Sequence, residues 1–152
     1  MMNKTKSLGI SLLAASALIL STLMVSSTAH ATKMLVHKTP LCGCCRLWVN
    51  HLEAEGFDVE IEDHENLTSV KATLGVPLSL QSCHTAIVGG YLIEGHVPVE
   101  DIRRLLEERP DAFGLAVPGM PLGSPGMEVD GRKQPYNVVL FSQNEQAVFA
   151  IH

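Results

Sequence analysis

The chain has 152 residues, a formal net charge of −5, 46% hydrophobic residues and only four cysteines. This length allows a domain with a substantial buried core. The acidic balance argues against nucleic acid as a partner, because a nucleic-acid-binding surface is basic.

Residues 1–31 are interpreted as a cleavable export signal. Two lysines lie within the first six residues, an almost uncharged apolar run covers residues 8–25, and residues 29–31 read Ala-His-Ala, a small-residue cleavage pattern. A membrane anchor is the alternative, since the apolar run could nearly span a bilayer. We favour cleavage after Ala31, which predicts an exported protein with no stable membrane anchor. The mature domain, residues 32–152, then holds nine Lys and Arg against sixteen Asp and Glu.

Strands and helices alternate in the first half of the mature domain. Helical spacing of apolar residues ends at Gly56 and again at Gly75. In the second predicted helix, Val70 and Leu74 are expected to point inward. Strands are predicted at residues 33–38 and 57–62, and helices at residues 46–55 and 66–74.

The second half contains two predicted hairpins separated by an irregular stretch. The first hairpin turns at Gly89-Gly90, a strong two-residue turn signal. Residues 114–127 hold four glycines, three prolines and two methionines, so regular structure is not expected there. The predicted elements are strands at 85–88 and 91–94, a helix at 99–108, and strands at 136–141 and 146–151.

Three of the four cysteines, Cys42, Cys44 and Cys45, crowd into four residues at the start of the first predicted helix. A helix N-terminus favours thiolate over thiol, so this loop suits nucleophilic or metal-binding chemistry. The fourth, Cys83, is followed directly by His84. Exported proteins usually pair their cysteines, but adjacent Cys44 and Cys45 cannot bridge without strain. A redox-type bridge between Cys42 and Cys45 remains open.

The predicted element order, β-α-β-α-β-β-α, is that of a thioredoxin-like α/β domain, extended here by residues 110–152 with the Gly/Pro/Met loop and a C-terminal hairpin. Cys42 and Cys45 resemble the redox pair of that superfamily. By the same resemblance, His84 occupies the place of the superfamily's cis-proline. This resemblance implies that Cys83 and His84 lie against the cysteine loop.

More narrowly, the chain resembles the exported CopG-type copper-resistance proteins. The resemblance is carried by Cys42-Gly43-Cys44-Cys45, Cys83-His84, Gly95-His96-Val97-Pro98 and the tail at residues 117–128, Val-Pro-Gly-Met-Pro-Leu-Gly-Ser-Pro-Gly-Met-Glu. It implies a thioredoxin-like fold, a periplasmic location, and copper binding through a cysteine-bridged, multi-copper cluster with redox activity.

The metal site is expected to comprise Cys42, Cys44, Cys45, Cys83 and His84. Thiolates with imidazole suit Cu(I) and Zn(II). One tetrahedral zinc ion takes four ligands and would leave Cys44 idle, whereas thiolates shared among several Cu(I) ions would use every cysteine. Copper is therefore favoured, zinc is second and an iron–sulfur cluster third.

Four other residues are candidates for additional ligands. His96 precedes a predicted helix and could be a ligand or a hydrogen-bonding support. His37 lies on the first predicted strand, next to the cysteine loop. Met120 and Met127 are soft thioethers in the Gly/Pro loop, although gap-filling is the ordinary role of methionine. His64 is interpreted as solvated, and His51 as a core or surface residue.

The sequence is compatible with three different functions. The favoured one is copper handling, by sequestration, Cu(I)/Cu(II) conversion or delivery to a copper-export system, and enzymatic activity as a copper oxidoreductase stays open. The second is thiol–disulfide exchange, in which Cys42 attacks and Cys45 resolves. The third is a structural zinc domain.

Overall fold

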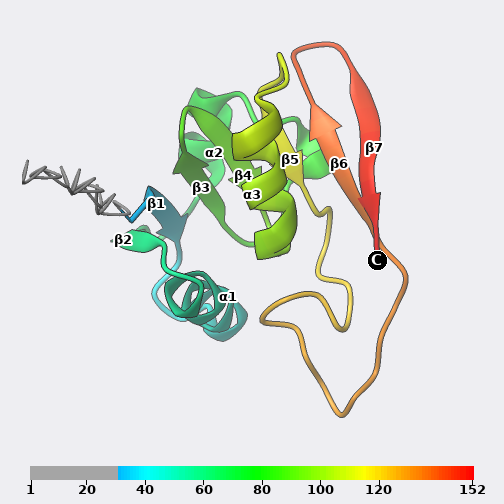
Figure 1. The fold of residues 1–152 in the computed structure, drawn as a ribbon. Helices are drawn as coiled ribbons and strands as arrows, with labels where there is room; N and C mark the ends of the chain where they lie inside the picture. Colours follow the sequence, from blue (N-terminus) through cyan, green and yellow to red (C-terminus); the bar gives the residue numbers. More distant parts are fainter. Residues whose placement is uncertain (1–30) are drawn as a thin grey trace, which may run out of the picture.

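The computed structural model describes residues 31–152, in which a seven-stranded mixed sheet is flanked by three α-helices (Figure 1). Apart from Ala31, the expected export signal lies outside the described residues. Within residues 31–152, no helix is long and apolar enough to cross a membrane.

The sheet has the strand order β2-β1-β3-β4-β5-β6-β7. β1 and β2 are parallel, as are β4 and β5, and the other neighbours are antiparallel. Each parallel pair is joined through a helix, because a parallel connection must cross over the sheet. The strands are β1 (Lys33–Lys38), β2 (Asp58–Asp63), β3 (Thr85–Val88), β4 (Tyr91–Glu94), β5 (Gly114–Ala116), β6 (Asn137–Phe141) and β7 (Gln146–Ile151). The helices are α1 (Gly43–Ala54), α2 (Thr68–Leu74) and α3 (Val99–Glu108), with a 3₁₀ turn at Leu78–Leu80.

The predicted elements are present in the predicted order, with one addition. β5 lies at the start of the stretch where no regular structure was expected. It pairs with β4 on one side and β6 on the other, and thereby joins the C-terminal hairpin to the sheet. Gly114 allows this approach, since a Cβ there would lie 1.8 Å from the Leu92 carbonyl oxygen. A three-residue strand is too short to show a hydrophobic period, so its pairing partners define it.

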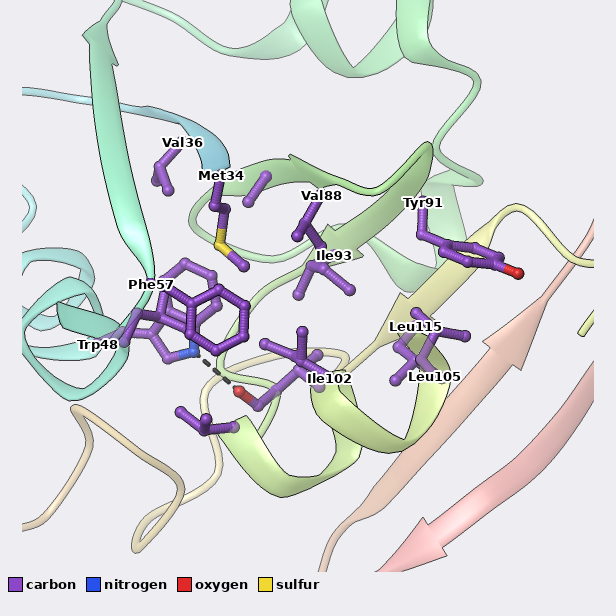
Figure 2. Packing of buried hydrophobic residues seen from close by; sticks show 14 of the residues in the cluster. Met34, Val36, Trp48, Phe57, Val88, Tyr91, Ile93, Ile102, Leu105 and Leu115 are labelled. Atoms are coloured by element: carbon purple, nitrogen blue, oxygen red, sulfur yellow. Dashed lines mark hydrogen bonds between the residues drawn. The ribbon is translucent and has the colours of Figure 1, made fainter. Parts of the chain in front are cut away.

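The two faces of the sheet carry different helices. Helices α1 and α3 pack on one face, where Trp48, Ile93 and Ile102 belong to the main hydrophobic core (Figure 2). The α2 side carries a smaller apolar cluster that includes Leu92 and Phe141. Successive strand residues therefore alternate between two separate environments.

The inward residue of α2 differs from the prediction. Leu74 packs against the smaller cluster, as predicted, but it and Val70 are only half-buried, whereas Lys71 is 5% exposed. The Lys71 ammonium donates to Glu94 Oε1 at 2.5 Å and to Thr85 Oγ1 at 2.8 Å. A buried lysine requires such a partner, because an isolated charge is costly to remove from water.

The remaining oxygens of this buried network are also bonded. The Thr85 hydroxyl donates to Glu94 Oε2 at 2.6 Å, and the Ser82 N–H donates to Glu94 Oε1 at 2.6 Å. Burial raises the pKa of Glu94, and the Lys71 charge opposes that shift. The network fixes Ser82 and Thr85, which flank the Cys83-His84 pair.

Candidate metal centre

The cysteine loop forms the N-terminus of α1. The helix begins at Gly43, three residues before its predicted start, so Cys44 and Cys45 lie in its first turn. Cys42 caps the helix, with its sulfur accepting from the Cys45 N–H at 3.4 Å. Cys42 and Cys45 are joined by a disulfide, the redox-type bridge that the sequence left open. Cys44 remains a free thiol, 3.5 Å from the Cys42 sulfur.

The fourth cysteine completes a compact group of sulfur atoms. Cys83 lies far from the loop in sequence, yet the sulfurs of Cys42, Cys44, Cys45 and Cys83 all lie within 4.8 Å of one another. Burial raises the pKa of the Cys83 thiol to about 12, with a further contribution from neighbouring Cys44. Without a metal, Cys83 is therefore protonated at neutral pH, and a bound metal would have to displace that proton.

Two buried imidazoles face the Cys83 sulfur. It lies 3.0 Å from His96 Nε2 and 3.5 Å from His84 Nδ1. Burial lowers the pKa of both histidines, for His84 well below the ordinary value. Neutral imidazoles carry a lone pair that can bind a metal ion.

The orientation of His96 is set by the backbone. Its Nδ1 lies 2.8 Å from the Pro125 carbonyl oxygen. A carbonyl oxygen only accepts, so Nδ1 carries the proton and Nε2 directs its lone pair towards Cys83. Histidine ligands in metal sites are commonly held by this kind of second hydrogen bond.

The polar edge of His84 is incompletely bonded. The His84 ring packs against the Trp48 ring, with the ring centroids 4.2 Å apart. The Trp48 N–H does not bond to His84, because it donates to the Val97 carbonyl at 2.9 Å. His84 Nε2 is buried and has no hydrogen-bond partner among residues 31–152. Such an atom costs about 1–3 kcal/mol. The site thus contains a buried ring nitrogen without a hydrogen-bond partner in the described part of the chain, as expected where a ligand would bind.

The Gly/Pro/Met loop covers this group. The Ser82 hydroxyl donates to the Gly119 carbonyl. At Gly126 a Cβ would lie 2.7 Å from both the Cys44 carbonyl oxygen and the Trp48 nitrogen, so only glycine fits against α1. Met120 is 53% exposed and Met127 is half-buried in the same loop. Their role as ligands stays a prediction.

The other candidate histidine lies in a different group. His37 is close to Glu62 and His64, and His64, interpreted as solvated, contacts the His37 ring nitrogen at 3.0 Å. Register pairs His37 with Glu62 across β1 and β2, which the sequence pattern does not reveal. His51 is exposed, and its Nε2 lies 2.9 Å from Glu128 Oε1.

The donor set is suited to two kinds of chemistry. Sulfur and imidazole ligands select soft or borderline metals such as Cu(I) and Zn(II). A Cys-x-x-Cys disulfide at a helix N-terminus can also exchange with other thiols.

Comparisons with known proteins link this site to a family. A family model described as "Protein of unknown function, DUF411" matches residues 80–127, which include Cys83, His84, His96 and the first part of the loop that follows β5. No curated protein sequence matches the chain. Two solved structures of the copper resistance protein CopG, forms 2 and 1, are 45% identical to the chain, with TM-scores of 0.77 and 0.76. Each match covers 81% of this chain, and 99% and 98% of the respective structures.

Proposed function

Because this chain belongs to the family of the CopG copper resistance proteins, we propose that it binds copper in copper resistance and homeostasis, as an exported periplasmic protein. Its mature part, residues 32–152, would be one thioredoxin-like domain. The element order β-α-β-α-β-β-α before the C-terminal extension supports that assignment. Delivery of copper to an export system would be part of the same role.

The proposed site uses Cys42, Cys44, Cys45, Cys83 and His84, with His96 as a further donor. The observation that carries the proposal is the convergence of four sulfur atoms within 4.8 Å, together with two neutral imidazoles at Cys83. Four thiolates in this space suit Cu(I), which favours soft ligands. Sulfurs shared between several Cu(I) ions would employ all four cysteines.

The Cys42–Cys45 disulfide gives the site a redox step. Opening it consumes two electrons and two protons, which a dithiol reductant can supply, and releases two thiols for metal binding. In the reverse direction, two Cu(II) ions each gain one electron while the two thiols close to the disulfide and release two protons. Copper oxidoreductase activity is thus part of the proposal. It fails if the reduced protein converts no Cu(II) to Cu(I).

Metal content and stoichiometry test the proposal. Residues 32–152, reduced anaerobically, are offered copper and zinc together, with a Cys44→Ser variant alongside. We expect more than one copper per chain and fewer in the variant. A single zinc ion unaffected at Cys44 would instead support a structural zinc site, and chelation would then unfold the protein. His51→Gln serves as a histidine control outside the site.

Thiol–disulfide exchange is the second candidate, and the Cys42–Cys45 disulfide at the α1 N-terminus favours it. This function predicts that Cys44→Ser and His84→Ala retain dithiol activity, since neither residue belongs to the redox pair. If the reduced protein binds no metal, thiol–disulfide exchange becomes the favoured function.

A further inference from the structure

A second group of ligand atoms lies on the α2 side of the sheet. His37 Nδ1 lies 3.0 Å from His64 Nε2 and 3.2 Å from Glu62 Oε2, and the last two atoms are 3.7 Å apart. Residues Ser69, Val70, Thr73 and Leu74 of α2 line the same open surface hollow. The group shares no residue with the sulfur cluster.

Strand alternation separates the two groups. Val36 belongs to the main core below α1 and α3, so the next residue, His37, points to the opposite face. His84, by contrast, packs on Trp48 of that main core. An ion held by His37 would therefore lie across the sheet from the sulfur cluster.

The backbone holds the three side chains in place. His37 and Glu62 are register partners on neighbouring parallel strands, which directs their side chains to the same face. The His64 N–H donates to the Lys38 carbonyl at 2.9 Å, and the Lys38 ammonium pairs with Asp63 at 2.7 Å. The chain leaving β2 is thus fastened to β1, and the His64 ring is placed over His37.

The separations fit one metal ion. Two ligand atoms each about 2.0–2.2 Å from a tetrahedral ion stand about 3.3–3.6 Å apart. The observed separations of 3.0, 3.2 and 3.7 Å bracket that value. Only small side-chain movements would be needed to give all three atoms a common centre.

Charge and access favour an ion as well. Two ring nitrogens and a carboxylate oxygen converge, and a cation between them would bind a lone pair of each atom. The His64 and Glu62 side chains are 28% and 51% exposed, which leaves a route from solvent and an open coordination position.

We propose that His37, Glu62 and His64 form a second metal site, for a divalent ion of the Cu(II) and Zn(II) class. Imidazole and carboxylate are suitable ligands for both ions, and Cu(II) binds more tightly than Zn(II) to a given site of this type. The sulfur cluster and this site would then differ in the oxidation state of copper that each prefers. The inference does not depend on the proposed function, because the two sites have no ligand in common.

Residue-resolved NMR of the histidine rings tests the site. Residues 32–152 with the Cys42–Cys45 disulfide intact are titrated with Zn(II). We expect the ring signals of His37 and His64 to shift together, saturating at one ion per chain in addition to any zinc bound by thiols. His64→Gln should abolish the shift at His37 and remove one bound ion. His51→Gln, a matched exposed histidine with a glutamate partner, should change neither.

A second measurement separates this site from the sulfur cluster. In a Cys44→Ser/Cys83→Ser variant, added Cu(II) should give an electron paramagnetic resonance spectrum with coupling to two nitrogens, and His64→Gln in that background should remove one coupling. Failure of copper binding at the thiols would leave these signals intact. Absence of both the zinc shift and the two-nitrogen spectrum in folded protein would overturn the inference and identify the group as hydrogen-bonded only.

Discussion

The molecule contains two buried polar groups, one around Thr85 and the other around His84. They differ in how many of their polar atoms form hydrogen bonds. Around Thr85, the Lys71 ammonium and both Glu94 oxygens are all partnered. Around His84, a ring nitrogen lacks any partner in the described chain and two cysteines are free. A satisfied buried network stabilises a fold, whereas an unsatisfied one is costly. The first group therefore holds the second in place, and the second retains free donor atoms that could bind a metal ion.

The largest effect should come from breaking the satisfied group. Lys71→Met leaves Glu94 buried without its counter-charge, and we expect a loss of about 3–5 kcal/mol in the free energy of unfolding. Denaturant unfolding of the metal-free protein measures this. A loss below about 1 kcal/mol would contradict the role assigned to the pair.

The matched control removes both charges. In Lys71→Met/Glu94→Gln no uncompensated charge remains, so most of the lost stability should return, since replacing a buried pair is often neutral. If the double variant is as unstable as Lys71→Met, packing around Lys71 rather than charge pairing is the cause.

Acidification should act mainly through the histidines. The folded state lowers the pKa of His84, His96 and His37. Below about pH 6.5 the unfolded chain takes up protons that the folded protein does not, so stability is full above that pH and falls as pH decreases towards the folded pKa values. Each such histidine contributes about 1.4 kcal/mol per pH unit within that window. Glu94, with its raised pKa, opposes the trend in part.

Urea unfolding of the metal-free protein between pH 7.5 and 5.5 checks this dependence. Stability that is constant or rises on acidification would contradict the assignment of neutral, buried imidazoles. His84→Leu should give a shallower pH dependence, because one of the contributing groups is gone.

The smallest effect on stability concerns the unsatisfied group itself. His84→Leu replaces a buried ring that has an unpartnered nitrogen by an apolar side chain of similar size, next to Trp48. We expect the metal-free protein to be unchanged or about 1 kcal/mol more stable, while the copper bound per chain decreases. A stability loss above about 2 kcal/mol would show that the ring is fully bonded in the folded protein.

Local signals in the sequence were sufficient for most of the fold. The Gly89-Gly90 pair predicts a hairpin because a tight two-residue turn requires positive φ, which glycine adopts easily. The hairpin forms at these residues, and both glycines have positive φ. The crowding of Cys42, Cys44 and Cys45 at a helix start is likewise a local feature. Resemblance to a family, rather than periodicity, brought Cys83 to the cysteine loop.

The features that could not be predicted from the sequence depend on pairing between distant parts of the chain. The three-residue β5 exists through its neighbours on both sides. Lys71 looks like a surface residue until Glu94, 23 positions later, is placed opposite it. The approach of His37 to Glu62 and His64 likewise follows from the register of β1 and β2, which no local pattern specifies.

The loop that covers the sulfur cluster belongs to the segment 117–136, which begins and ends in the sheet. It leaves after Ala116 of β5 and returns at Asn137 of β6, and these two strands are hydrogen-bonded to each other. Once they pair, the loop is a closed ring of chain, and the entropy lost when Pro125 settles on His96 is smaller than for a free tail. A single proteolytic cut within this loop would open the ring without removing a residue. The arrangement of the candidate metal centre thus depends on the continuity of the chain as well as on its composition.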